Sequence, residues 1–226
     1  MCIVIWKPKG VKITEELYNA FVKSGENNSD GIGVAIKREG SKGLSVCKGL
    51  YKPESFVDAL KNIKLYDDDE ILFHARIRTH GDISNENCHP YIVSSDENIR
   101  DLLNEDAIRY PVLAHNGFLA EFHDGSKHSD TYCYVQSYAT IPEFMSLMER
   151  AGNVEKPDEK LQKMILSGWS KICVMFPEEE RKTILLGNFQ QDLGGCYFSN
   201  STYRDYGYKR KGKKSAEPEI NYTLVD

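Results

Sequence analysis

Short runs of apolar, β-branched and aromatic residues, bounded by Gly, Pro and polar clusters, recur along the chain and predict strands. Two of these runs are joined by a Gly- and Lys-rich segment, as in a β-hairpin, and Gly31 and Gly33 in the first run indicate that another segment approaches its backbone closely. Asn116-Gly117 is the strongest short hairpin signal in the chain. The strands are expected at 2–6, 31–36, 44–47, 70–78, briefly after Pro90, on both sides of 116–117 within 111–122, and at 171–176, 183–187 and 195–199.

Apolar residues spaced three and four positions apart predict helices between some of these strands. Thr14 can cap the first helix, which has two glutamates in its first turn, and Gly25 is expected to end it. Pro53 and Pro142 suit the first turn of two further helices. The helices are expected over 14–25, 53–63, 96 to about 104, 140–151 and 157–166.

The length of 226 residues is sufficient for one large domain, and no repeat or break in composition divides it. We therefore expect one domain over 2–206, followed by a basic, flexible tail over 207–226. A net charge of −5 argues against a general nucleic-acid binder. The basic tail is the exception. It could be a plain solvated segment, or it could be an arm that binds nucleic acid or a membrane.

The six cysteines form no CxxC pair and lack the His spacing of zinc sites. This arrangement argues against both a zinc centre and a disulfide framework. The N-terminal segment has only a short apolar run before Lys7 and no cleavage-site pattern, so we expect neither a signal peptide nor a membrane span. These features predict a cytoplasmic protein.

The stretch from Leu72 to Pro90 is crowded with donors and cations. If residues 70–78 form a strand that continues in the same direction, the side chains at its even positions share one face. An alternative is a solvated face at the edge of a sheet. The even positions carry His74, Arg76, Arg78 and His80.

Cys2 directly follows the initiator methionine. Removal of Met1 would leave Cys2 with a free α-amine, whose ordinary pKa of about 7.7–8.0 lies close to that of a thiol, about 8.5. A weak base and a strong nucleophile would then belong to one residue. The alternative is a buried cysteine in a strand.

Two other segments offer groups that amide chemistry needs. The Asn116 side chain and the Gly117 N–H could both donate to an oxyanion, although a plain hairpin turn explains the same dipeptide. The Asp130 carboxylate could bind an ammonium group, although a cap or turn aspartate is the simpler explanation.

Six motifs follow one another through the first 135 residues: Cys2, DGIGVAI at 30–36, HARIRTHG at 74–81, NENCHP at 85–90, HNG at 115–117 and SDT at 129–131. In order and approximate spacing they resemble a class II glutamine amidotransferase domain, which belongs to the N-terminal nucleophile (Ntn) hydrolases. The resemblance implies an α+β fold, a four-layer αββα sandwich in which two antiparallel sheets lie between helical layers.

The resemblance also implies roles for particular residues. Cys2 corresponds to the nucleophile, with its own α-amine as the base. The Asn116 side chain and the Gly117 N–H correspond to the oxyanion hole, Arg76 to the group that binds the glutamine α-carboxylate, and Asp130 to the partner of its α-amino group. The positions that shape the pocket correspond to Thr79, His80 and His89.

The implied reaction is hydrolysis of the glutamine side-chain amide through a γ-glutamyl thioester, which releases glutamate and supplies ammonia to a separate acceptor synthetase. We expect no metal and no cofactor. The chain departs from the usual family pattern at Ile3 and Ile77, and its segment from Pro90 to His115 is long enough to form a lid or partner surface.

Three alternatives remain open at this point. The first is hydrolysis of another γ-glutamyl or small amide compound, and the second is a non-catalytic binding module in which Met1 is never removed. The third is a metallohydrolase that uses His74, His80, His89 and Asp130.

Overall fold

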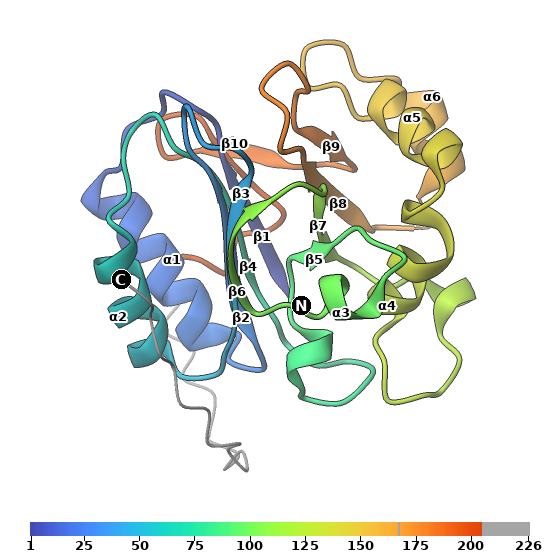
Figure 1. The fold of residues 1–226 in the computed structure, drawn as a ribbon, viewed down its shortest axis with the longest axis horizontal. Coiled ribbons are helices and arrows are strands. Elements are labelled where there is room, and N and C mark those ends of the chain that lie inside the picture. Colours follow the sequence, from blue (N-terminus) through green and yellow to red (C-terminus); the bar gives the residue numbers. More distant parts are fainter. Residues whose placement is uncertain (167, 205–226) are drawn as a thin grey trace.

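The computed structural model describes residues 1–166 and 168–204, so the predicted tail and the last two residues of the predicted domain lie outside the described residues. Two antiparallel sheets face each other, and helices cover the outer face of each sheet (Figure 1). The expected four-layer αββα architecture is confirmed.

The larger sheet contains seven strands and includes the N-terminal strand near its middle. Its central pairs are antiparallel, with Ile3 opposite Ala75 and Ile32 opposite Ala75 on the other side. In spatial order the strands are β10 (Gln190–Asp192), β11 (Cys196–Phe198), β1 (Ile3–Lys7), β4 (Glu70–Ala75), β2 (Ile32–Lys37), β3 (Leu44–Leu50) and β6 (Asn104–Ile108).

The smaller sheet contains four strands and packs against the inner face of the larger one. Its central strands pair with Asn116 opposite Lys171 and Val112 opposite Met175. In spatial order the strands are β5 (Tyr91–Ile92), β7 (Val112–Asn116), β8 (Lys171–Met175) and β9 (Ile184–Leu186).

The helices divide between the two outer faces. The first two pack on the larger sheet through Phe21 and Phe56, whose rings contact Phe73 of β4. The helices after residue 129 pack on the smaller sheet through residues such as Met148, whereas Ile99 of the short helix at 97–100 packs against the layer between the sheets. The α-helices are α1 (Glu15–Asn27), α2 (Pro53–Ile63), α3 (Glu97–Arg100), α4 (Asp130–Tyr134), α5 (Pro142–Ala151) and α6 (Glu159–Ile165); 3-10 turns span Asn85–Asn87 and Ala120–Phe122, and a π-helical turn spans Val135–Ala139.

Several local predictions are confirmed. Thr14 caps α1 by accepting the Leu17 N–H at 3.2 Å. The hairpin of β2 and β3 forms, and the close approach predicted at its glycines is present. A Cβ on Gly31 would lie 2.6 Å from the Cys88 sulfur, and one on Gly33 would lie 2.1 Å from the His89 carbonyl oxygen.

The predicted strand over 70–78 is too long, because β4 ends at Ala75. Arg76 still donates its backbone N–H to the Gly31 carbonyl at 2.8 Å, but Arg78 donates its own to the Asp30 carboxylate instead. The even positions therefore do not form one continuous polar face. His74 is buried, whereas Arg78 is exposed.

The hairpin predicted at Asn116-Gly117 is wrong. Strand β7 ends at Asn116, and the chain turns away into a loop and a 3-10 turn, so no second strand forms over 118–122. The partners of β7 are β5 and β8. Asp130, which accepts the Leu119 N–H at 2.7 Å, anchors the diverted segment.

Other boundaries also differ from the prediction. The helix over 96–104 shrinks to α3, and the polar segment after it forms β6 at the edge of the larger sheet. Helix α1 runs past Gly25, where a Cβ would lie 2.8 Å from Ile32 Cδ1. Strand β10 and helix α4 were not predicted. All six cysteines are free thiols.

Candidate active site

Side chains alternate between the two faces of a strand, and this alternation along three strands brings the main candidate residues to one layer of the molecule. Val4 and Trp6 of β1, Leu72 of β4 and Ala114 of β7 pack in the apolar layer between the sheets. Cys2, Arg76 and Asn116 have the same parity as these residues on the same three segments. Continuing the β1–β4 register by one position from Ile3 opposite Ala75 places Cys2 opposite Arg76.

Cys2 is held next to the first residue of β1 by one contact of its thiol and one of its backbone carbonyl. Its Sγ donates to the Ile77 carbonyl at 3.4 Å, and the Asn200 side-chain amide donates to the Cys2 carbonyl at 2.6 Å. Burial raises the pKa of the thiol, whereas the Ile77 contact, the Arg76 cation and the chain's amino group lower it, and the Asp130 carboxylate raises it. The nucleophile candidate therefore lies within the electrostatic reach of both a cation and an anion.

The Arg76 guanidinium is buried and fixed by the loop that follows it. Its Nη1 donates to the Asp82 carbonyl at 2.8 Å, and its Nη2 donates to the His80 carbonyl at 2.6 Å. Guanidinium has five N–H donors, so these two bonds orient the group without using all of them. The arrangement keeps a directed cation next to the thiol.

Asn116 and Gly117 lie at the end of β7, and both are closely packed. The Asn116 Nδ2 donates to the Ser199 hydroxyl at 3.0 Å, while its Oδ1 is buried without a hydrogen-bond partner. A Cβ on Gly117 would lie 2.5 Å from Ser170 Oγ and 2.7 Å from His115 Nε2. No residue other than glycine fits this position without moving its neighbours.

The Asp130 carboxylate is buried at the start of α4 and organises the backbone around it. One oxygen accepts the Leu119 N–H at 2.7 Å, and the other accepts the Thr131 N–H at 2.7 Å. The preceding Ser129 is the N-cap of α4 and accepts the Tyr132 N–H at 3.1 Å. The Thr131 hydroxyl also donates to the Asp130 carboxylate, at 3.3 Å. A carboxylate has about four acceptor positions, so these three bonds leave room for an ammonium group.

Three buried histidines form a layer behind these residues. His74 and His89 have ring centroids 4.0 Å apart, the His74 Nε2 contacts the His115 carbonyl at 3.1 Å, and the His115 Nδ1 contacts the Thr131 hydroxyl at 2.8 Å. Burial is the main cause that lowers the pKa of His74 to about 3, that of His115 to about 4 and that of His89 well below its ordinary value. The three rings are therefore neutral at pH 7.

This histidine layer predicts loss of stability in mild acid. The unfolded chain binds protons near pH 6.5, while the folded rings stay neutral to about pH 4 or below, so the free energy of unfolding decreases as the pH falls through this window. The expected slope is up to about 1.4 kcal/mol per pH unit for each histidine. Urea unfolding at pH 7, 6 and 5 measures it.

The matched control is His80→Gln, because His80 is only partly buried and lies outside this layer. We expect that variant to keep the slope of the wild type. A free energy of unfolding that does not change between pH 7 and 5 would contradict the assignment of three neutral buried rings.

The three residues predicted to shape the pocket lie in different surroundings. Thr79 is exposed on the loop after β4. The His80 ring contacts Phe118 and His123, with centroid distances of 4.6 and 4.2 Å. His89 is buried and packs against Tyr91 at 4.6 Å. His80 therefore lies beside the segment that follows Gly117, whereas His89 belongs to the interior.

Sequence reasoning missed three residues near Cys2 and Asn116, namely Lys171, Ser199 and Asn200. Lys171 donates from Nζ to the Ser199 carbonyl, and Asn200 donates to the Cys2 carbonyl. No local pattern distinguishes these residues, because 171 and 199 are simply the predicted ends of two strands. The signal is the pairing of those strands with β7 and β1, which only the tertiary structure supplies.

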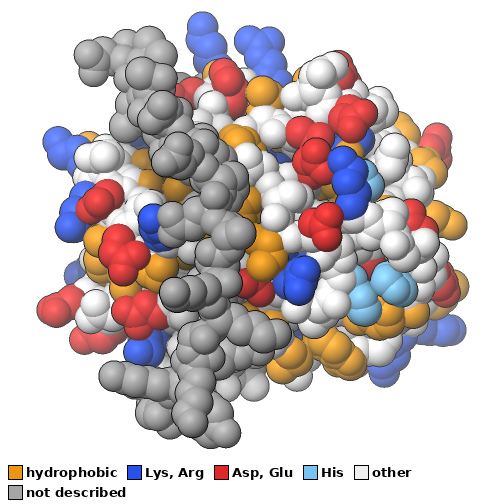
Figure 2. Space-filling view, turned by 90° about the horizontal axis from the view of Figure 1, so that it is seen from below, with side chains coloured by type: hydrophobic (Ala, Val, Ile, Leu, Met, Phe, Trp, Pro, Cys, Tyr) orange, Lys and Arg blue, Asp and Glu red, His pale blue; other side chains and the backbone are white. Residues whose placement is uncertain are grey.

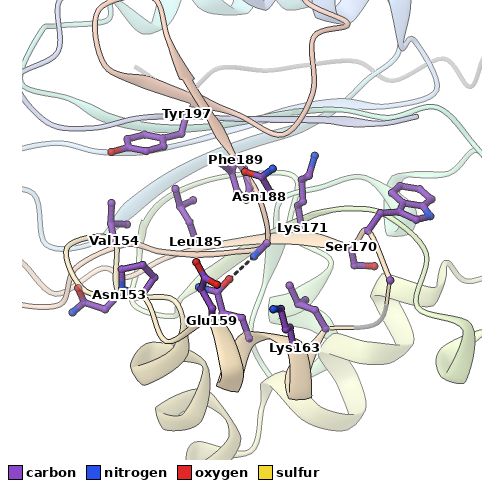
Figure 3. Close-up of a pocket in the computed structure, with 16 residues that line it drawn as sticks. Asn153, Val154, Glu159, Lys163, Ser170, Lys171, Leu185, Asn188, Phe189 and Tyr197 are labelled. Atoms are coloured by element: carbon purple, nitrogen blue, oxygen red, sulfur yellow. Dashed lines mark hydrogen bonds between the residues drawn. The ribbon is translucent and has the colours of Figure 1, made fainter.

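A cavity of about 820 Å³ lies next to this region, between α6, β9 and the strand that carries Tyr197 (Figure 3). Ser170 and Lys171 belong both to its wall and to the surroundings of Asn116 and Gly117. In Figure 3 the Lys171 side chain points away from Lys163 on α6 and toward the strand of Tyr197. The cavity therefore reaches the residues that pack against Asn116 and Gly117.

The surface charge is mixed. On the face shown in Figure 2, the acidic and basic side chains are interspersed, and a few histidines lie near one edge. Within residues 1–166 and 168–204, no helix is both long enough and apolar enough to cross a membrane. No group of three or more His, Cys, Asp or Glu residues in that part of the chain could hold a metal ion, so His74, His80, His89 and Asp130 do not form a ligand set.

Solved structures with a similar fold include two that are enzymes by their descriptions. One is a glutamine phosphoribosylpyrophosphate amidotransferase from B. subtilis in complex with ADP and GMP, with a TM-score of 0.48 and 15% identity, and the other is described as the allosteric regulatory enzyme of purine biosynthesis, with a TM-score of 0.49 and 14% identity. Each match covers 88% of this chain and 41% of the other, so the chain spans less than half the length of these proteins. No protein-family model and no curated protein matches the chain.

Proposed function

We propose that this protein hydrolyses the side-chain amide of glutamine with Cys2 as the nucleophile. The observation that carries the proposal is the position of the Cys2 thiol at the end of β1, within electrostatic reach of both the Arg76 guanidinium and the Asp130 carboxylate. A free amino acid carries one negative and one positive group at its α-carbon. A buried cation opposite Cys2 in the strand register, and a buried anion whose charge acts on the thiol, match that pair of charges.

The reaction follows from the groups around the thiol. Once Met1 is removed, the α-amine of Cys2 accepts the thiol proton, and the sulfur attacks the amide carbon of the substrate. The carbon–nitrogen bond breaks, the proton goes to the leaving nitrogen, and ammonia departs from a γ-glutamyl thioester. Water then cleaves the carbon–sulfur bond, which releases glutamate and restores the thiol.

Asn116 and Gly117 are the proposed donors to the oxyanion of this reaction. They follow one another at the end of β7, and Ser199, which contacts Asn116, also contacts Val4 on the nucleophile strand. Donors held in place before the reaction stabilise developing charge without reorganisation. We propose that the ammonia is used by a separate acceptor synthetase.

This mechanism requires that the α-amine of Cys2 is free. With Met1 in place the nitrogen of Cys2 is an amide and cannot act as a base. Met1 is 59% exposed, so it is accessible for removal. The direct test is to measure glutamate and ammonia release by protein whose intact mass shows that Met1 is absent, and equal amounts of the two products are expected. Failure of this processed protein to release either product would contradict the proposal.

Arg76 is expected to determine recognition of the substrate carboxylate. Arg76→Lys keeps the charge but removes the planar pair of donors, and hydrogen bonds to charged groups contribute about 1.5–3 kcal/mol. We therefore expect the KM for glutamine to rise by about 10- to 100-fold with a smaller change in kcat. Steady-state kinetics of glutamate release measures both constants.

Arg78→Lys is the matched control for this substitution. Arg78 lies two residues further on, its side chain is exposed, and only its backbone N–H contacts Asp30. We expect its KM to equal that of the wild type. If Arg76→Lys leaves the KM unchanged, or if both variants raise it equally, the role assigned to Arg76 is wrong.

A further inference from the structure

The pairing of β11 with β1 changes character at its last residue. The regular register joins Ile5 to Phe198. At the next pair, the Ser199 N–H donates to the Val4 carbonyl at 2.9 Å, but the Val4 N–H donates to the Ser199 hydroxyl at 2.8 Å instead of to a backbone carbonyl. A side-chain oxygen therefore takes the place of a backbone acceptor where the strand ends.

This substitution releases the Ser199 carbonyl for a contact with the other sheet. The carbonyl accepts a hydrogen bond from the Lys171 ammonium on β8, and Lys171 pairs in register with Asn116 on β7. Figure 3 shows Lys171 directed toward the strand that carries Tyr197, which is the strand that leads to Ser199. Completely buried Ser199 thus joins the strand of the nucleophile to the strand of the oxyanion donor.

The Ser199 hydroxyl also contacts the Asn116 side chain, with Oγ and Nδ2 3.0 Å apart. In this orientation the Asn116 Oδ1 is buried without a partner. Amide oxygen and nitrogen are assigned from their hydrogen bonds, and a serine hydroxyl can donate as well as accept. In the reverse orientation the Ser199 hydroxyl donates to Oδ1, which gives that oxygen a partner and leaves both Nδ2 hydrogens available.

We propose that Ser199 is a positioning residue that orients the Asn116 amide so that its nitrogen faces the oxyanion, with Lys171 fixing Ser199 in turn. This inference rests on the glutamine hydrolysis proposed above. Ser199 does not touch the substrate. It sets the direction of a donor and, through Val4, the distance between that donor and the nucleophile strand.

The test is the kinetics of Ser199→Ala in protein without Met1. Misplacement of a catalytic group by about 1 Å can cost on the order of 100-fold, so we expect kcat to fall by about 10- to 100-fold and the KM for glutamine to stay near its wild-type value. Ser199→Thr, which keeps a hydroxyl, is expected to recover most of the loss. Ser201→Ala is the control, because the Ser201 carbonyl, and not its hydroxyl, accepts the Arg204 N–H.

Two further measurements separate positioning from general damage to the site. Alkylation of Cys2 by iodoacetamide needs the thiolate but no oxyanion donor, so its rate should equal that of the wild type in Ser199→Ala. The double variant with Asn116→Ala should be no slower than Asn116→Ala alone, because both changes remove the same interaction. Lys171→Met, a change at a half-buried residue on the cavity wall, should lower kcat in the same way.

The outcomes are distinct. Wild-type protein without glutaminase activity overturns the proposed function and this inference together. An active wild type with Ser199→Ala and Lys171→Met at full kcat overturns the inference alone. Loss of kcat together with slower alkylation, or additive losses in the double variant, shows general disruption and also overturns it. Loss of kcat with unchanged alkylation and no additivity supports it.

Discussion

Cys2→Ala is expected to remove almost all glutamine hydrolysis by this protein. The covalent route requires a sulfur at this position, and removal of an enzyme's nucleophile lowers turnover by on the order of 10⁴-fold or more. The thiol donates only to the Ile77 carbonyl, and the Asn200 amide donates to the Cys2 backbone carbonyl, which alanine keeps, so the variant should still fold. Glutamate release and thermal unfolding, measured on the same preparation, check both expectations.

Cys133→Ala is the matched control for loss of a thiol. Cys133 is partly buried in α4, and its sulfur contacts Asp124 at 3.9 Å. We expect this variant to keep full activity. Substantial turnover in folded Cys2→Ala protein would show that another group carries the reaction.

Asn116→Ala is expected to lower kcat by on the order of 10²–10³ while Cys2 remains reactive toward a simple alkylating agent. The side-chain amide is the proposed donor to the oxyanion, and the methyl group of alanine has no N–H to replace it. Because the thiol and its surroundings are unchanged, the loss should fall on kcat and not on the KM. Steady-state kinetics and the rate of Cys2 alkylation separate the two effects.

Asn98→Ala, at an exposed position in α3, serves as the control for this change. The central expectation fails if Asn116→Ala retains wild-type kcat. It also fails if the loss of turnover is matched by an equal loss in the alkylation rate, because the damage would then lie at the nucleophile.

Local sequence patterns predicted much of the fold. Strand β1, the β2–β3 hairpin and α2 follow from apolar periodicity and from Gly and Pro positions, which act within a few residues. The glycines at 31 and 33 also indicated correctly that another segment lies close, and that segment is 88–89.

The failures share one physical cause, which is that tertiary pairing overrides local preference. The Asn116-Gly117 signal normally indicates a hairpin, but the partners of β7 come from β5 and β8, and Gly117 is instead required by close packing against Ser170 and His115. The polar strand β6 has no apolar alternation, because it lies at the exposed edge of its sheet.

The candidate site divides in the same way. Cys2, Arg76, Asn116 and Asp130 could be chosen from residue type and order along the chain, whereas Ser199 and Lys171 could not. Their contacts depend on a change of pairing at the end of β11 and on the stacking of two sheets. The order of residues along the chain indicates neither the change of pairing nor the stacking.

Mapping the site of covalent modification by an electrophilic analogue of glutamine tests the central claim most directly. Protein without Met1 is treated with the analogue, digested, and its modified peptide identified by mass spectrometry, with and without excess glutamine. We predict one adduct per chain, on Cys2, and protection of Cys2 by glutamine. An adduct on another residue, no adduct at all, or labelling of Cys2 that glutamine does not slow would contradict the proposed glutamine site.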